Sequence, residues 1–123
     1  MTKEELRTMI ENGENIENVD VTDITDMSYL FEGIDRFDQD LTSWDVSNVL
    51  TMEGMFDTTE FNQDISSWDV SNVNNMNSMF FHATSFNQPL NNWNVSNVRY
   101  ERNVSVRHRL QSAIEQVGCV ECS

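Results

Sequence analysis

The apolar residues of this chain recur at a fixed period of 24 or 25 residues. Three tryptophans and the three phenylalanines that precede them hold equivalent places in successive segments: Trp44, Trp68 and Trp93; Phe37, Phe61 and Phe86. Two of these segments also contain a methionine run that ends in phenylalanine, M-x-x-M-F, at Phe56 and at Phe80. A fixed period in this range is typical of tandem structural repeats, in which neighbouring units bury a continuous core. We therefore interpret the Trp, Phe and Met columns as stacked core.

Within each repeat, two different spacings follow one another. Ile65, Trp68 and Val70 have the L-x-x-L-x-L spacing of a strand whose alternate side chains point inward. The next apolar residues have helical spacing: Val73, Met76, Met79 and Phe80. These patterns predict an α/β repeat solenoid of the leucine-rich-repeat type, in which short parallel strands alternate with short helical turns.

The sequence pattern of residues 1–13 predicts an N-terminal capping helix. Thr2 is followed three residues later by Glu5, which is the spacing of a capping box, and Gly13 is a suitable end. The apolar residues form one stripe: Leu6, Met9 and Ile10. A helix of this kind would cover the apolar end of the first repeat.

Residues 14–98 contain about three and a half repeats, of which the first is degenerate and the last keeps the pattern only to Val98. Residues 99–123 form a divergent tail. One explanation of the tail is a C-terminal capping helix, with Ser105 as its N-cap and Gly118 at its end.

The genetic code offers a second explanation of the tail. Read one nucleotide later, codons compatible with this segment spell D-M-N-A-M-F-R-Y-A-T-A-F-N-Q-P-L-N-R-W-D-V-S-N-V, which is a further repeat in register with Trp93. This frameshift hypothesis predicts the codon GTG at Val117 and AAT at Asn103. Sequencing the coding DNA tests it, because any other codon at either position contradicts the hypothesis.

The chain is strongly acidic, with a formal net charge of −14. Residues 12–98 hold fifteen acidic residues and a single base, Arg36. Such a body repels nucleic acid and attracts basic protein surfaces or cations, although charge of this kind also serves solubility alone. No apolar run reaches the ~18 residues of a membrane span. The N-terminus lacks the apolar core of a secretory signal peptide.

The string F-N-Q-x-[IL]-x-x-W-[DN]-V-S-N-V, followed by M-x-x-M-F, resembles the repeat of the BspA-like leucine-rich-repeat surface proteins. It is similar also to the repeats of mycoplasma surface lipoproteins. The resemblance covers Val19 to Val98, loosely in the first copy and closely in the other three. It implies display on the cell surface or secretion, adhesion, and binding of a host protein, and it brings no catalytic residues. Since no signal peptide is evident, a cytoplasmic location is the alternative.

The outward positions of the predicted strands supply the candidate binding residues. One column is expected to face solvent: Asp20, Asp45, Asp69 and Asn94. The serines two residues before and two residues after its members are expected to face solvent with it: Ser43 and Ser67 before, Ser47 and Ser71 after. Carboxylates stacked at ladder spacing repel one another, so a cation or a basic partner would stabilise them. A solvated face without a ligand is the alternative. A second column, Asn48, Asn72 and Asn97, is explained by side-chain amides that bond to turn backbone.

Catalytic and metal chemistry find little support in the sequence. Cys119 and Cys122 form a C-x-x-C pair, but His82 and His108 are the only histidines that could complete a zinc site. There is no glycine-rich phosphate loop, no H-E-x-x-H and no nucleophile elbow. We therefore predict that the chain is not an enzyme and carries no cofactor and no metal, and that the cysteine pair is incidental.

Two functions remain. The first is a non-enzymatic protein-binding or adhesion module that uses its acidic face to recognise a protein with a basic surface. The second is a structural or spacer fragment of a repeat protein without a ligand, truncated if the frameshift hypothesis holds. An uncapped last repeat would also expose Trp93 and Val95 and favour end-to-end self-association.

Overall fold

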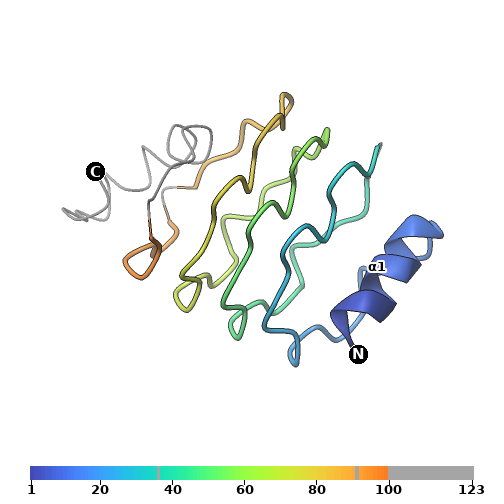
Figure 1. Cartoon of the computed structure of the whole chain (residues 1–123), viewed down its shortest axis with the longest axis horizontal. Coiled ribbons are helices and arrows are strands. Elements are labelled where there is room, and N and C mark those ends of the chain that lie inside the picture. The colour runs from blue at the N-terminus through green and yellow to red at the C-terminus, as the bar shows by residue number, and fades with distance from the viewer. Residues whose placement is uncertain (36, 91, 100–123) are drawn as a thin grey trace.

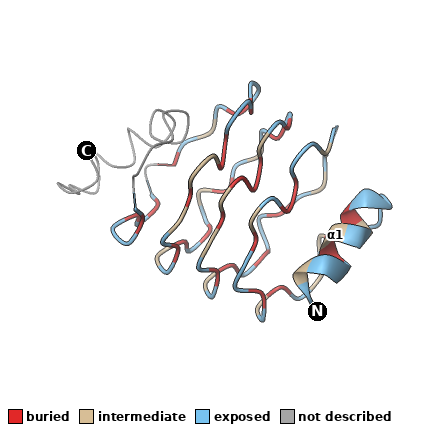
Figure 2. Cartoon of the chain, in the orientation of Figure 1, coloured by how far each residue is buried: buried red, intermediate tan, exposed pale blue. Residues whose placement is uncertain are grey.

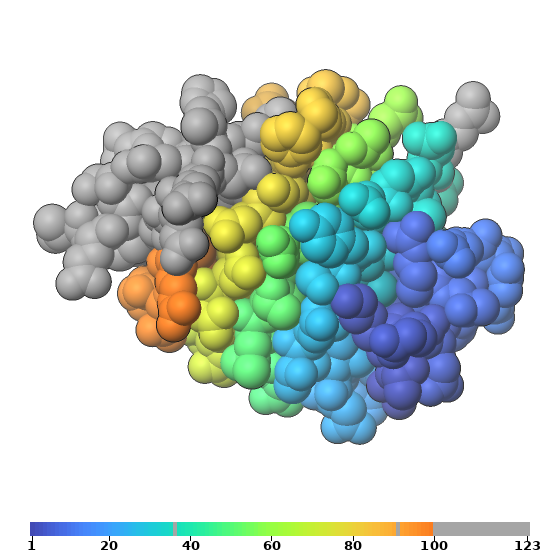
Figure 3. Space-filling view, viewed as in Figure 1, coloured from blue at the N-terminus to red at the C-terminus, as the bar shows by residue number. Residues whose placement is uncertain are grey.

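The repeats lie side by side in a row, with a helix at the N-terminal end (Figure 1). A computed structural model describes residues 1–35, 37–90 and 92–99. In Figure 3, the helix and the successive repeats form adjoining bands on the surface of the molecule.

The helix is α1 (Lys3–Glu11), and it begins with the predicted capping box. The Glu5 N–H donates to Thr2 Oγ1 at 3.1 Å, and the Thr2 N–H donates to Glu5 Oε1 at 3.2 Å. Leu6 and Ile10 on its inner face are buried in the same core as the repeats. The N-terminal helix predicted from the sequence is therefore present, and it packs as a cap would.

The predicted α/β solenoid of the leucine-rich-repeat type is wrong. Across the described ranges the chain forms no strand and no sheet, and α1 is the only helix. Two isolated parallel bridges, Asp26 with Thr51 and Thr51 with Asn75, are all that remains of the expected ladder. The repeats are instead built from tight turns.

The segment that was expected to be a strand folds into consecutive turns. The Trp44 N–H donates to the Leu41 carbonyl at 3.1 Å, and the Val49 N–H donates to the Val46 carbonyl at 3.0 Å. The same two bonds recur in the following repeats. An i to i+3 bond consumes backbone groups that a strand would offer to its neighbour. The L-x-x-L spacing therefore places two apolar side chains at the ends of a turn.

The segment that was expected to be a helical turn is not helical either. We call it the Met–Phe segment; it comprises residues 27–33, 52–58 and 76–82 in the three repeats. Each copy has two residues in the left-handed region, with φ between 57° and 70°: Tyr29 and Gly33; Gly54 and Thr58; Ser78 and His82. A right-handed helix does not contain such residues, because a left-handed residue with a Cβ costs about 1–2 kcal/mol.

Alternate N–H groups of the Met–Phe segment bond to the next repeat. Met27 donates to the Thr51 carbonyl at 3.0 Å and Phe31 to the Met55 carbonyl at 2.9 Å. Tyr29 and Gly33 donate in the same way to the carbonyls of Glu53 and Asp57. The bonds between the second and third copies repeat this pattern at 2.7 to 2.9 Å. These bonds hold the repeats in register.

The predicted core columns are confirmed. Phe31, Phe56 and Phe80 stack with ring centroids 5.4 and 5.8 Å apart, and their planes are within 8° of parallel. Trp44 stacks on Trp68 in the same manner, at 6.4 Å. Figure 2 shows that the buried residues follow the inner side of every repeat.

Each indole also ties its repeat to the one before. Trp44 Nε1 donates to the Ile16 carbonyl at 2.9 Å, and the other two tryptophans donate to the corresponding carbonyls of their preceding repeats. Burial of an indole is inexpensive only when its N–H is paired in this way.

The expectations for the tail concern residues outside the described part of the chain. They include the helix beginning at Ser105, the shifted reading frame, and the pair Cys119 and Cys122. Trp93 and Val95, whose exposure was expected if the last repeat is uncapped, are buried in this structure.

Candidate binding surface

Each residue of the predicted acidic column begins the same kind of turn. Asp45 Oδ1 accepts the Ser47 N–H at 3.0 Å and the Ser47 hydroxyl at 2.6 Å. The turn recurs at equivalent positions: Asp20 with Thr22, Asp69 with Ser71, and Asn94 with Ser96. These are Asx turns, in which a short polar side chain replaces a backbone acceptor. The turn therefore fixes the direction of each exposed side chain.

The same hydrogen bonds favour the ionised carboxylates. The Ser47 hydroxyl and then its N–H hold the pKa of Asp45 below its ordinary value of 3.8. Ser71 lowers the pKa of Asp69 in the same way. The negative charge of Asp20 partly offsets this by raising the pKa of Asp45, and the negative charge of Asp45 likewise raises the pKa of Asp69. The carboxylates of successive repeats therefore lie close enough to repel one another, as the sequence predicts.

The serines of the candidate site have different roles. Ser47 and Ser71 hold the carboxylates through the turns just described. Ser43 is exposed, and its hydroxyl donates to the Glu17 carbonyl of the preceding repeat at 3.0 Å. Ser67 is exposed as well. The structure thus brings the serines that follow each Asp into contact with it, whereas Ser43 connects two repeats.

The asparagine column has the structural role predicted for it. Asn72 Nδ2 donates to the Ser47 carbonyl at 2.7 Å, and Asn48 and Asn97 make the equivalent bonds at 2.9 and 2.8 Å. Each amide reaches the backbone of the repeat before it. Because these donors are occupied by the fold, the column is a connection between repeats and not a binding site.

A second amide ladder was not foreseen from the sequence. Gln39 Oε1 accepts the Ile16 N–H at 2.6 Å, while its Nε2 donates to the Glu14 carbonyl at 2.8 Å. Gln63 repeats this arrangement one unit later, with the Leu41 N–H and the Gln39 carbonyl. The recurrence of glutamine two residues after each of Phe37, Phe61 and Phe86 was the signal that could have revealed it.

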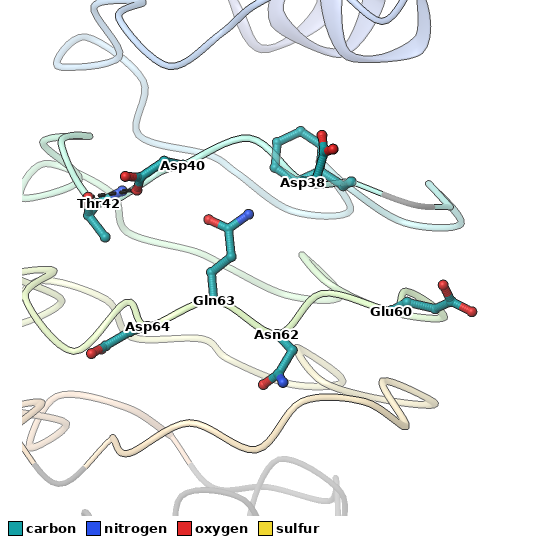
Figure 4. Close-up of a pocket in the computed structure, with 8 residues that line it drawn as sticks. Asp38, Asp40, Thr42, Glu60, Asn62, Gln63 and Asp64 are labelled. Atoms are coloured by element: carbon teal, nitrogen blue, oxygen red, sulfur yellow. Dashed lines mark hydrogen bonds between the residues drawn. The ribbon is translucent and has the colours of Figure 1, made fainter.

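The structure also contains an acidic hollow that the sequence analysis missed. The hollow has a volume of about 500 Å³ and lies between the second and third repeats; its lining is Phe37, Asp38, Asp40, Thr42, Glu60, Asn62, Gln63 and Asp64 (Figure 4). Thr42 donates to Asp40, and Figure 4 shows Gln63 extending from its own repeat toward the other. Hydrogen bonds from Thr42 and from Ser66 lower the pKa of Asp40 and of Asp64 respectively. The hollow therefore carries negative charge.

Neither acidic surface forms a metal site. No group of three or more His, Cys, Asp or Glu side chains within residues 1–35, 37–90 and 92–99 is arranged to hold a metal ion. The described residues also contain no helix of the length and apolarity that a membrane span requires.

A helix-capped row of tandem repeats, joined by amide ladders and lined by acidic turns, defines a repeat protein. The chain belongs to the family described as "Mycoplasma protein of unknown function, DUF285", whose family model matches residues 3–115. The matched region includes α1 and every described repeat. This agrees with the resemblance to mycoplasma repeat proteins noted in the sequence. No curated protein and no solved structure matches the chain.

Proposed function

We propose that this chain is a non-enzymatic binding module that recognises a protein with a basic surface through the acidic column. The supporting observation is the fixed direction of its carboxylates. Asp45 Oδ1 is held by Ser47, whereas Oδ2 has no hydrogen-bond partner among the described residues. Asp20 and Asp69 are held in the same way. Acceptors fixed before binding lose little conformational freedom when lysine or arginine side chains reach them.

The mutual repulsion of the column supports the same function. A cationic partner would relieve the repulsion between Asp20 and Asp45 and between Asp45 and Asp69. The resemblance of the repeats to BspA-like surface proteins favours an adhesive role at the cell surface or after secretion, with a host protein as the partner. A cytoplasmic location is the alternative. No cofactor is needed for this function.

A specific observation favours a spacer without a ligand as the second candidate. Each acidic residue of the column also stabilises its own turn, and each neighbouring asparagine ties two repeats together. The polar columns are therefore accounted for by folding alone.

The double variant Asp45→Asn/Asp69→Asn separates the two candidates. Asn94 forms the same turn with Ser96, so asparagine removes the charge without removing the turn. The control, Asp38→Asn/Glu60→Gln, neutralises two carboxylates of the acidic hollow and changes the net charge equally. Binding to an immobilised lysine-rich polypeptide is measured by biosensor at several salt concentrations.

A binding module predicts that the column variant loses affinity at least about tenfold more than the control. Equal losses in both variants would mean that the probe responds only to overall charge, and the spacer would then be favoured. The melting temperature of each variant is measured in parallel, because a folded column variant is required for either conclusion.

A further inference from the structure

Tyr29 breaks the symmetry of the repeats at the first left-handed position of the Met–Phe segment. The equivalent positions in the other two segments hold small residues, Gly54 and Ser78. Tyr29 has φ 57°, a backbone conformation that disfavours any residue with a Cβ. The repeat therefore does not require an aromatic residue here. A bulky residue held in a disfavoured conformation is a reason to look for a function at that position.

The ring of Tyr29 lies against the backbone of the next repeat. A Cβ on Gly54 would lie 2.2 and 2.4 Å from Cε1 and Cδ1 of Tyr29, so the ring occupies the space that a side chain at Gly54 would fill. Gly54 is buried, whereas Tyr29 is 40% exposed. The second repeat therefore supports one side of the ring, and the residue still reaches solvent. A ring held in this way can accept a cation with little loss of conformational freedom.

Three carboxylates lie near this ring. Burial, and then the negative charges of Glu53, Asp57 and Glu32, raise the pKa of Tyr29 above its ordinary value of 10.0. The carboxylates are therefore close enough for their charges to act on the phenol. Glu32 belongs to the first Met–Phe segment, and Glu53 and Asp57 belong to the second. An exposed aromatic ring and negative charge from two repeats thus meet at one place on the surface.

The bases of α1 do not neutralise these carboxylates. Arg7 Nη1 donates to three backbone carbonyls at 3.2, 2.9 and 3.1 Å: those of Tyr29, Leu30 and Glu32. Arg7 Nε lies 2.8 Å from Glu11, and Lys3 Nζ lies 3.4 Å from Asp26. These are the two ion pairs within residues 1–35, 37–90 and 92–99, so the carboxylates near Tyr29 have no basic partner among those residues.

We propose that Tyr29, Glu32, Glu53 and Asp57 form a binding site for an arginine side chain of a protein partner. Charge complementarity favours a cation, and the ring favours one that is flat and weakly hydrated. A guanidinium stacks on an aromatic ring and donates to carboxylates through a planar fork of N–H groups, which a lysine ammonium lacks. The site includes no residue of the acidic column, so it does not depend on binding by that column.

NMR titration of the full-length chain with end-blocked tripeptides tests the proposal. The probe has arginine between two glycines. The control peptides replace this arginine with lysine or with citrulline, which has nearly the shape of arginine without its charge. The ring resonances of Tyr29 and the amide of Gly54 report binding at the site. We expect the arginine peptide to shift both saturably and to bind at least about threefold more tightly than the lysine peptide, and the citrulline peptide to have no effect.

Variants of the ring test its part in binding, with the Gly54 amide as the reporter. Tyr29→Ser should fold, because Ser78 holds the equivalent left-handed position in the third segment, and it should bind the arginine peptide at least about fivefold more weakly. Tyr29→Phe keeps the ring and should bind as the parent chain does.

Variants of the carboxylates separate this site from the acidic column. Glu53→Gln/Asp57→Asn keeps the ring and should weaken binding of the arginine peptide by at least about fivefold. Asp45→Asn/Asp69→Asn removes the same charge from the column and should leave this binding unchanged. The proposal is overturned by the absence of a saturable shift, by equal binding of the lysine peptide, or by equal losses in the two double variants.

Discussion

At the scale of single residues, the left-handed positions of the Met–Phe segment decide which side chains fit. Gly54 has φ 60°, and a Cβ on it would lie 2.2 Å from Tyr29 Cε1 of the preceding repeat, so glycine is required there for two reasons. The second left-handed position is less uniform, since it holds Gly33, Thr58 and His82 in the three repeats. Threonine is the least suited of these residues, because its branched Cβ crowds a left-handed backbone.

Replacing Thr58 with glycine should therefore stabilise the fold. Glycine removes the strain of a left-handed backbone, and it also costs stability because the unfolded chain gains conformational entropy. The first free energy is larger than the second, so we expect the free energy of unfolding to rise by about 0.5–1 kcal/mol. Urea denaturation measures it. Thr84→Gly is the matched control, because Thr84 is also exposed but is not left-handed, and it should lose stability. A loss at Thr58 equal to that at Thr84 would show that the position is unstrained.

At the scale of the repeat, side-chain amides supply the connections that strands were expected to supply. Gln63 accepts from the Leu41 N–H and donates to the Gln39 carbonyl, so its amide acts as an inserted peptide group between two repeats. Asn72 serves the same purpose on another side of the repeat. A ladder of this kind needs both a donor and an acceptor on one side chain, which limits the position to Gln or Asn.

Replacement of Gln63 with glutamate should weaken this joint. A carboxylate cannot donate to the Gln39 carbonyl, and we expect a loss of about 2–3 kcal/mol at neutral pH. Asn74→Asp adds the same charge at an exposed side chain and should cost less than about 0.5 kcal/mol. Both are measured by denaturation against the parent chain.

The glutamate variant should also recover with acid. The missing donor disfavours the charged form, so the pKa of the introduced glutamate is raised in the folded state, and its penalty is present above that pKa and lost as the pH falls through it. A penalty that persists in acid would show that the donated hydrogen bond is not what the repeat needs.

The sequence predicts some parts of this fold well and others badly, for identifiable reasons. The period, the stacked core and the capping box depend on which residues recur, and recurrence is visible in the sequence. The strands and helical turns were wrong because apolar residues three apart, such as Leu41 and Trp44, suit a turn as well as a helix or a bent strand. The turn at Asp45 was not predicted, although the acidic column was. The acidic hollow depends on how two repeats lie together, which no single repeat reveals.

At the scale of the whole molecule, the main role of α1 is to cover the first Met–Phe segment. Its two bases, Lys3 and Arg7, both donate hydrogen bonds to the first Met–Phe segment: Lys3 to the Ser28 hydroxyl and Arg7 to the Leu30 carbonyl. Arg7 also pairs with Glu11 at 2.8 Å, but that pair lies near the surface and contributes little. The guanidinium therefore stabilises the molecule chiefly through backbone carbonyls.

The variant Arg7→Met keeps an apolar stem and removes these donors. We expect a loss of about 2–3 kcal/mol in unfolding free energy, because three carbonyls lose a charged donor. Glu11→Gln removes only the surface pair and should change stability by less than about 0.5 kcal/mol. Comparable losses in the two variants would assign the role of Arg7 to the ion pair. Sedimentation velocity of the same variants shows whether the uncovered carbonyls of the first Met–Phe segment lead to head-to-tail assembly.

The backbone bonds between Met–Phe segments all run from the earlier repeat to the later one, and this has a consequence for how such chains change length. The two interfaces between Met–Phe segments join a donor edge to an acceptor edge in the same manner. A duplicated unit placed between them would meet a matching edge on each side, and α1 would keep its place. Gene duplication could therefore lengthen the row one repeat at a time without redesign of either end. Repeat number then becomes a property that selection can adjust independently of the fold.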